Sequence, residues 1–98
     1  MSASGFVLDT NVVSEAMRPR PDRRVVAWLR EHDARSWLSV VTIGEIEAGI
    51  RGARGTPIGA VDALIAATAA RHGLVVATRD VRDFEHLEVD TVDPWAAA

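Results

Sequence analysis

The chain of 98 residues contains no cysteine, and all 11 of its basic residues are arginine. Without cysteine it forms neither a disulfide nor a thiolate metal site, which fits a reducing compartment such as the cytoplasm. The lack of lysine, which we interpret as a genome-wide compositional bias, excludes every mechanism that requires a lysine. No basic region precedes a long apolar run at the N-terminus, so we expect no signal peptide. The longest apolar-leaning run, 63–70, is far shorter than the roughly 20 residues that span a bilayer.

The composition is that of an ordinary globular protein, with 48% hydrophobic and 26% charged residues. The length predicts one domain over residues 1–98. A net charge of −3 excludes a generally basic nucleic-acid binder but is compatible with a local basic patch.

Short apolar runs alternate with helical patterns along the chain. Four glycines between 49 and 59, together with Pro57, predict a loop there. Thr42 to Glu45 has the form of a capping box that begins a helix. We assign Trp28 and Trp37 to the core. We expect strands at 6–8, 36–41, 74–78 and 89–92, and helices at 10–17, at 22–32, from 42 onward and from about 61 to a cap at Gly73. This alternation predicts an α/β fold with a mostly parallel sheet flanked by helices.

Three apolar runs end on an acid: GFVLDTN contains Asp9, WLSVVTIGE ends at Glu45 and LVVATRD ends at Asp80. Asp62 lies in the predicted first turn of the helix that leads back to the third strand. In open parallel α/β sheets, ligand sites lie outside the carboxyl ends of the strands. We therefore expect these four carboxylates to meet in one cleft.

Four anions at close quarters repel one another unless a cation lies among them. Oxygen ligands without histidine or cysteine favour Mg²⁺ or Mn²⁺, which support the hydrolysis of phosphodiesters. Each acid taken alone also has a structural interpretation. Glu45 completes the capping box, Asp62 favours a helix N-terminus, Asp9 caps the first helix and Asp80 occupies a turn. Their common position at one edge of the sheet favours the metal site.

Neighbouring polar residues have two interpretations each. Thr10 and Asn11 either hydrogen-bond the metal-binding acids or act as local caps. Asp83 either adds to the acid cluster or caps its turn. Four arginines are candidates for holding substrate phosphates and are otherwise solvated surface charges: Arg51, Arg54, Arg79 and Arg82.

Four motifs occur in order: FVLDTNVVSE, SVVTIGEIEAGI, GAVDALIAATAARHGLVVATRDVRDF and a closing Asp-Pro-Trp. Together they resemble the PIN-domain ribonuclease toxins of the VapC type over nearly the whole chain. The resemblance implies that an acidic quartet binds Mg²⁺ or Mn²⁺ and cleaves RNA. It also implies a homodimer and a cognate VapB-like antitoxin that plugs the site, usually with an arginine. The motifs carry the quartet over to Asp9, Glu45, Asp62 and Asp80.

The chain departs from the family between Glu45 and Asp62, which are only 17 positions apart. Family members normally have a longer connection there, so we expect a sheet that has lost a central helical segment and an edge strand. A bare sheet edge favours pairing with another chain. The shortening therefore predicts tight dimerisation, with exchanged elements as one form, or a weakened protein.

Two other functions follow from these features. The chain could be an inactive remnant that binds the antitoxin or another partner without cutting RNA. It could also be a phosphotransfer protein with Asp9 as nucleophile. The second is disfavoured because Asn11 stands where a second acid is expected and because lysine is absent.

Overall fold

The computed structural model describes residues 5–50 and 58–96. Arg51 and Arg54, and most of the predicted loop, lie outside these residues. The helices and strands are, in chain order, β1 (Phe6–Leu8), α1 (Thr10–Ala16), α2 (Arg23–His32), η1 (Asp33–Arg35), β2 (Ser36–Leu38), α3 (Val40–Ile50), α4 (Ile58–His72), β3 (Val75–Ala77), η2 (Val81–Phe84) and β4 (Thr91–Val92), where η marks a 3₁₀ helix.

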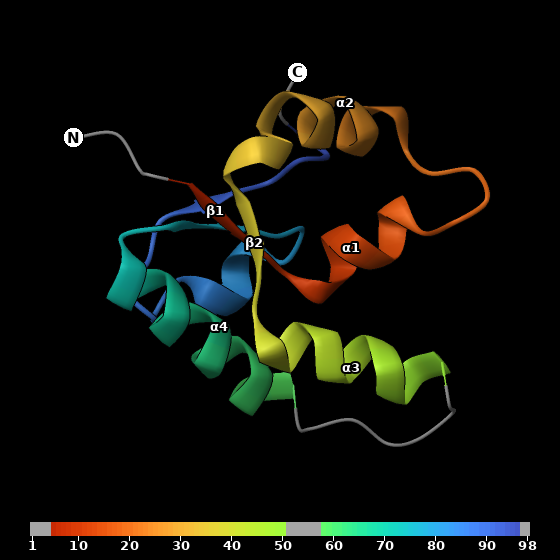
Figure 1. Cartoon of the computed structure of the whole chain (residues 1–98). Helices are drawn as coiled ribbons and strands as arrows, with labels where there is room; N and C mark the ends of the chain where they lie inside the picture. Colours follow the sequence, from red (N-terminus) through yellow and green to blue (C-terminus); the bar gives the residue numbers. More distant parts are fainter. Residues whose placement is uncertain (1–4, 51–57, 97–98) are drawn as a thin grey trace.

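The four strands form one parallel sheet in the order β2-β1-β3-β4 (Figure 1). Phe6 of β1 lies beside Ser36 of β2 and beside Val75 of β3. The predicted α/β architecture with a parallel sheet is therefore confirmed. Because the strands are parallel, β1, β2 and β3 all end at the same edge, where α1, α3 and the turn after β3 begin.

The sheet separates two apolar clusters because successive side chains of a strand point to opposite faces. Val7 and Val76 pack with Ile65 of α4 on one face. Leu8 and Ala77 pack on the other face, against α1 and α2. Figure 1 shows the sheet between α4 and the pair α1 and α2. The continuous apolar runs FVL and VVA suit strands that are covered on both faces.

Local signals begin and end the helices as predicted. Asp9 caps α1, and the Asp22 side chain accepts a hydrogen bond from the Arg24 backbone N–H at 2.8 Å at the start of α2. Gly73 ends α4 in the left-handed conformation, with φ of 64°. Among the described residues, no helix is both long enough and apolar enough to cross a membrane.

The region after β2 differs from the prediction. The strand ends at Leu38 rather than 41, and α3 begins at Val40. The Ser39 hydroxyl accepts a hydrogen bond from the Thr42 backbone N–H at 3.1 Å, so Ser39 caps the helix. The predicted capping box at Thr42 was wrong because Thr42 already lies in the helix. The last strand is also shorter than predicted, and the ends of the predicted loop belong to α3 and α4.

Only one of the two tryptophans assigned to the core is buried. Trp28 is buried, with 5% of its surface exposed, whereas Trp37 is 61% exposed on the outer strand of the sheet. The assignment of Trp37 to the core was wrong because no strand among the described residues covers the outer edge of β2.

Candidate active site

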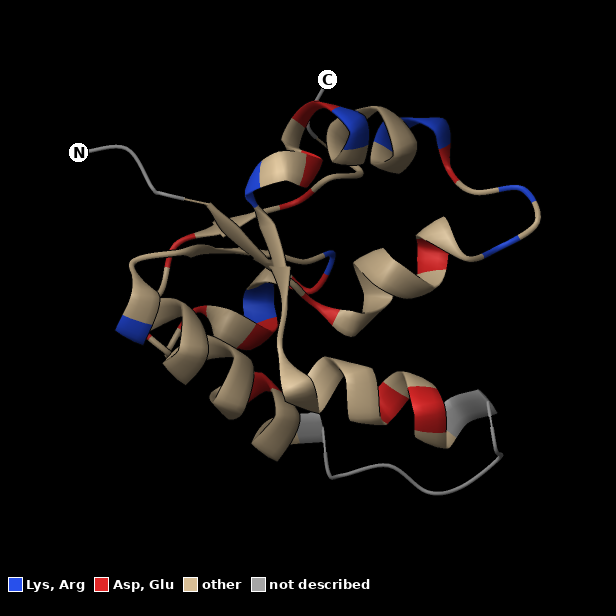
Figure 2. Cartoon of the chain, in the orientation of Figure 1, with Lys and Arg blue, Asp and Glu red and all other residues tan. Residues whose placement is uncertain are grey.

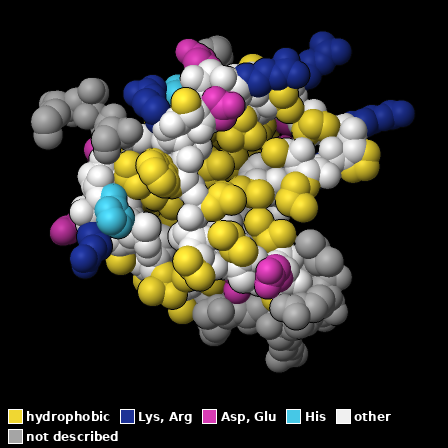
Figure 3. Space-filling model, in the orientation of Figure 1, with side chains coloured by type: hydrophobic (Ala, Val, Ile, Leu, Met, Phe, Trp, Pro, Cys, Tyr) yellow, Lys and Arg dark blue, Asp and Glu magenta, His cyan; other side chains and the backbone are white. Residues whose placement is uncertain are grey.

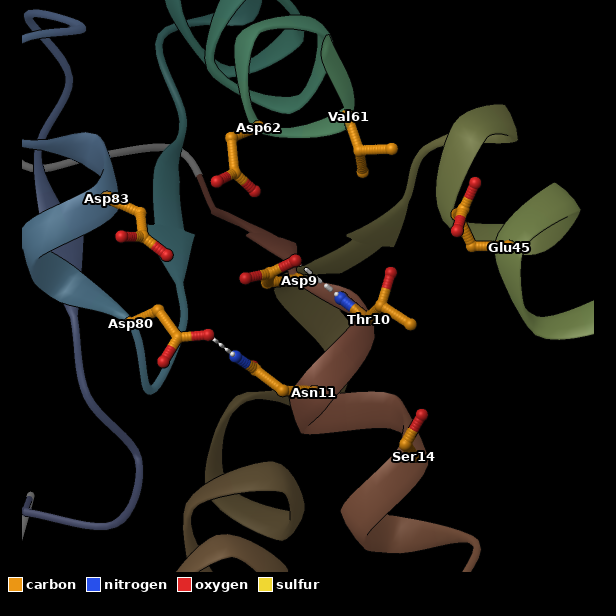
Figure 4. Close-up of a pocket in the computed structure, with 9 residues that line it drawn as sticks. All are labelled: Asp9, Thr10, Asn11, Ser14, Glu45, Val61, Asp62, Asp80 and Asp83. Carbon is orange, nitrogen blue, oxygen red and sulfur yellow. Dashed lines mark hydrogen bonds between the residues drawn. The ribbon is translucent and has the colours of Figure 1, made fainter. Parts of the chain in front are cut away.

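A cavity of about 420 Å³ opens at the carboxyl edge of the sheet (Figure 4). All four predicted carboxylates line it: Asp9 after β1, Glu45 on α3, Asp62 on α4 and Asp80 after β3. Figure 2 shows acidic residues from these separate elements around the middle of the molecule, whereas many of the arginines lie on α2 and the segment before it. The predicted convergence of the acids on one cleft agrees with their positions.

Asp9 is the most deeply placed of these acids, with 6% of its surface exposed. Its Oδ1 accepts a hydrogen bond from the Thr10 backbone N–H at 2.7 Å, and its Oδ2 accepts one from the Thr78 hydroxyl at 2.7 Å. Burial raises the pKa of Asp9 above 3.8, while these two hydrogen bonds oppose the rise and the charges of Asp80 and Asp83 add to it. Asp9 thus both caps α1 and presents a carboxylate to the cavity.

Thr78, which the sequence did not single out, connects Asp9 to Asp80. Its buried hydroxyl donates to Asp9 and accepts from the Asp80 backbone N–H at 3.0 Å. The Asn11 amide donates to Asp80 Oδ2 at 3.0 Å and also lies 3.5 Å from the Thr78 hydroxyl. The only signal in the sequence was position, since Thr78 directly follows β3 and precedes Asp80 by two residues.

Asp62 lies farther into its helix than predicted, because α4 begins at Ile58. No acid lies in the first turn of α4, so the helix dipole does not account for Asp62. Burial raises its pKa to about 6, and the charges of Asp9, Asp83 and Asp80, in that order, add to the rise. The unfavourable electrostatic position of Asp62 favours a role with a cation over a structural one.

Asp83 belongs to the same acid cluster, and Glu45 lies apart from it. Asp83 is in η2, and its charge raises the pKa of both Asp9 and Asp62. Figure 4 shows four aspartates around the same space, whereas Glu45 projects from α3 on the other side of the cavity. The structure therefore gathers Asp9, Asp62, Asp80 and Asp83, with Glu45 on the opposite wall.

The donor set suits a hard divalent cation, because the cavity offers carboxylate, hydroxyl and amide oxygens without histidine or cysteine. Within residues 5–50 and 58–96, no three acidic, histidine or cysteine side chains are close enough to hold one ion as they stand. Binding of an ion therefore requires these carboxylates to draw closer together.

Two of the predicted RNA-binding arginines flank the acids. The Arg79 guanidinium lies over the Trp95 ring, 5.1 Å from its centroid, and the Arg79 backbone N–H donates to Asn11 Oδ1 at 3.4 Å. Arg82 is exposed on η2. Both arginines line a shallow pocket beside Asp80 and Asp83.

The chain was compared with known proteins. No protein-family model matches it. The VapC ribonuclease Y4jK of Sinorhizobium fredii is 31% identical, over 95% of this chain and 99% of the relative. The chain belongs to the VapC-type PIN-domain toxins. Toxin FitB of Neisseria gonorrhoeae is 30% identical, over 92% of this chain and 98% of FitB.

The crystal structure of FitAcB from the same organism matches with a TM-score of 0.75 at 28% identity, over 94% of this chain and 99% of that chain. The structure of FitAB bound to an IR36 DNA fragment matches with a TM-score of 0.77 at 27% identity, over 95% of this chain and 97% of that chain.

This VapC-type chain is shorter than its relatives in its interior. The alignment with Y4jK spans 139 positions, and 139 − 98 leaves at least 41 positions of the relative without a counterpart. Because the alignment covers nearly all of both chains, these positions lie mainly inside it. The predicted shortening is confirmed, and its placement between Glu45 and Asp62 stays a prediction.

Proposed function

We propose that this chain is a metal-dependent endoribonuclease and the toxin of a toxin–antitoxin pair. The observation that carries this proposal is the gathering of Asp9, Asp62, Asp80 and Asp83 in one cavity, where burial, together with the charges of the other three, raises the pKa of Asp62 to about 6. A bound cation would offset this mutual repulsion. Membership of the VapC-type family, which includes a protein named as a ribonuclease, supports RNA as the substrate.

Asp9, Asp62 and Asp80 are the residues that hold Mg²⁺ or Mn²⁺ in this proposal. A bound ion would offset negative charge on the scissile phosphate and lower the pKa of a water molecule. Asp83 and Glu45 border the same cavity and orient water or RNA there. Thr10 and Thr78 keep the Asp9 carboxylate in place through the two hydrogen bonds at 2.7 Å.

The chain's own groups divide the remaining work. Asn11 orients Asp80. Asp62 has a pKa of about 6 without a cation, and a cation bound beside it would lower that pKa and keep its carboxylate ionised as a ligand. Water adds to phosphorus and the bond to the 3′ oxygen breaks, which leaves a 5′-phosphate and a 3′-hydroxyl. Arg79 and Arg82 bind neighbouring phosphates of the RNA. The Trp95 ring contacts the Arg79 guanidinium through a cation–π interaction, which keeps the guanidinium in position.

The partners follow from the family. The solved FitAcB and FitAB structures support a cognate VapB-like antitoxin as the protein partner of this chain. We further propose a homodimer and a cytoplasmic location, which the absence of cysteine suits.

The test is cleavage of a structured RNA by the purified chain with Mn²⁺. Asp9→Asn should lower the cleavage rate by more than about 100-fold. Loss of a residue that only hydrogen-bonds a metal ligand costs up to about 100-fold, and Asp9 is itself a ligand in this proposal. Asp33→Asn is the matched control, because Asp33 is exposed in η1 and does not line the cavity. Cleavage by Asp9→Asn at the wild-type rate would refute the proposal.

A second candidate is a remnant that binds the antitoxin without cutting RNA. It is favoured by the spacing of the acids, since among the described residues no three are close enough to hold an ion, and by the loss of at least 41 positions relative to Y4jK. This candidate predicts that wild type and Asp9→Asn are equally inert with Mn²⁺ and bind the antitoxin equally well.

A further inference from the structure

Four of the 11 arginines lie close together, between the end of α1 and the start of α2. All four side chains are exposed, and we call them the arginine arm: Arg18, Arg20, Arg23 and Arg24. Figure 2 shows basic residues along this segment, and Figure 3 shows basic side chains projecting from the same part of the molecule into solvent. In a chain of net charge −3, the arm is a local concentration of positive charge, which is the usual electrostatic feature of a nucleic-acid contact.

A buried carboxylate holds the arm in a fixed conformation. Glu15, near the end of α1, has only 8% of its surface exposed, and the chemistry proposed for the cavity does not use it. Its Oε2 accepts a hydrogen bond from the Asp22 backbone N–H at 2.9 Å, and its Oε1 accepts one from the Arg18 guanidinium at 3.2 Å. A buried carboxylate is costly unless it is hydrogen-bonded, so these contacts tie both ends of the segment to α1. Pro19 and Pro21 restrict the backbone between them.

The charge of the arm is accessible to a ligand from solvent. Arg18 and Arg24 pair with acids of the same segment, at 3.2 and 2.9 Å, yet 66% and 58% of their side chains are exposed. Within residues 5–50 and 58–96, neither Arg20 nor Arg23 forms an ion pair. A ligand that binds these two guanidinium groups therefore breaks no ion pair of the described chain.

Helix α1 connects the arm to the acid cavity. Asn11 and Ser14 of α1 line the cavity, and Glu15, which anchors the arm, directly follows Ser14. The seven residues of α1 span about 10 Å, so the arm begins about that far from the first acid.

A second connection runs over the turn that follows β4. The hydrogen bond and charge of Asp22 raise the pKa of Arg24, and the charge of Asp93 adds to the rise, which shows that Asp93 lies near the arm. Asp93 also lines the shallow pocket that contains Arg79 and Arg82 beside the acids. The arm, this pocket and the acid cavity therefore lie on adjoining surface.

We propose that the arginine arm binds phosphates of the RNA strand outside the acid cavity, an inference that rests on the proposed nuclease function. The cavity itself repels RNA because four aspartates line it, so attraction for the strand has to come from neighbouring surface. In a stacked strand successive phosphates advance about 3.4 Å, so a strand that follows α1 reaches the arm about three nucleotides from the cleaved bond. Glu15 is a positioning residue, because it presents the arginines without touching the RNA.

The first test measures the affinity for a fluorescent single-stranded RNA of about 12 nucleotides by anisotropy, in the presence of a chelator that prevents cleavage. Arg20→Gln combined with Arg23→Gln should weaken binding about tenfold at low salt. The slope of log affinity against log salt concentration should become shallower by about 1.4, because each phosphate contact with a single strand contributes about 0.7.

The matched control is Arg30→Gln combined with Arg71→Gln. It removes the same total charge from two exposed arginines in the last turns of α2 and α4, and neither residue lines the acid cavity or the shallow pocket beside it. The slope for this control should equal that of wild type. Circular dichroism and the melting temperature check that each variant is folded.

The second test separates the position of the arginines from the net charge. Glu15→Gln removes a negative charge beside the arm, so charge alone predicts tighter binding of RNA. The proposal predicts weaker binding, because the variant loses the acceptor that holds the Arg18 guanidinium at 3.2 Å. Tighter binding by a folded Glu15→Gln variant would overturn the positioning role of Glu15.

The outcomes separate this proposal from the proposed nuclease activity. Wild-type affinity and salt slope in the Arg20 and Arg23 double variant overturn the arm, and so does an equal loss in the control, which would show a response to net charge alone. Loss of binding to polyglutamate with unchanged binding to RNA would assign the arm to an acidic polypeptide and overturn the proposal as well. Absence of cleavage by wild type with Mn²⁺ would instead overturn the nuclease, and binding in chelator is measured independently of it.

Discussion

Replacement of Thr78 by valine tests whether one buried hydroxyl holds the acid site together. The substitution keeps the shape of the side chain but removes the donor to Asp9 Oδ2, which now lies 2.7 Å away. Hydrogen bonds to charged groups contribute about 1.5–3 kcal/mol, so we expect the free energy of unfolding near neutral pH to fall by roughly 2 kcal/mol. In a domain of this size that lowers the melting temperature by about 8–16 °C.

The loss should depend on pH in a defined direction. Burial already raises the pKa of Asp9 above 3.8, and loss of the Thr78 bond raises it further. A carboxyl whose pKa is raised by folding binds protons more tightly when folded, so its contribution to stability is greatest below the unfolded pKa and is lost as pH rises through the folded pKa. Thr78→Val therefore costs most near pH 7, where Asp9 is ionised, and about 1 kcal/mol in acid, where the bond is to a neutral group.

Urea unfolding of wild type and variant, at about pH 7 and about pH 3.5, measures this difference. Thr68→Val is the matched control, because the Thr68 hydroxyl donates to the Leu64 backbone carbonyl within α4 and not to a carboxylate. Its effect should be small and the same at both pH values. An equal loss at both pH values for Thr78→Val would refute the charge-linked role of this hydroxyl.

Three other predictions concern the same cavity and its supporting helix. NMR titration should find an Asp62 pKa of about 6 without metal, and Asp80→Asn should lower it because one of the charges that raise it is removed. Mn²⁺ at 100 times its dissociation constant should stabilise wild type by about 2.7 kcal/mol, seen as a higher melting temperature, whereas an equal shift in Asp62→Ala would contradict a shared site. Gly73→Ala should lower the free energy of unfolding by about 1 kcal/mol because the φ of Gly73 is 64°. Gly59→Ala in α4, where open space surrounds the glycine, should leave the free energy of unfolding unchanged or raise it by up to about 1 kcal/mol. A destabilised Gly59→Ala would contradict this backbone argument.

Much of the fold could be predicted from the sequence because its signals are local. The apolar triplets of β1 and β3 bury both faces, Asp22 caps α2, and Gly73 ends α4, each within a few residues of the position expected. The errors came where two local signals competed. At the start of α3, Ser39 and Thr42 are both good caps, and Ser39 prevailed because the strand before it ends one residue earlier.

The candidate site was predicted in outline for a different reason. Each acid follows or faces the end of an apolar run, and parallel strands bring those ends together, so the convergence of Asp9, Asp62 and Asp80 needed only the sheet type. The sequence alone left open whether Asp83 joins them. In the structure η2 turns Asp83 toward the aspartates, while Glu45 stays across the cavity on α3.

By itself, then, the sequence determined the alternation of strands and helices, the parallel sheet and the edge at which the acids lie. These features follow from the spacing of apolar residues and from helix caps, which act over only a few residues. The tertiary structure alone decided the contacts between distant segments. The Thr78 hydroxyl reaches Asp9 across 69 positions only because β1 and β3 are neighbours in the sheet. Trp37 is exposed, although its own residue type favours burial, because β2 is the outermost strand of the sheet and no strand among the described residues lies beyond it.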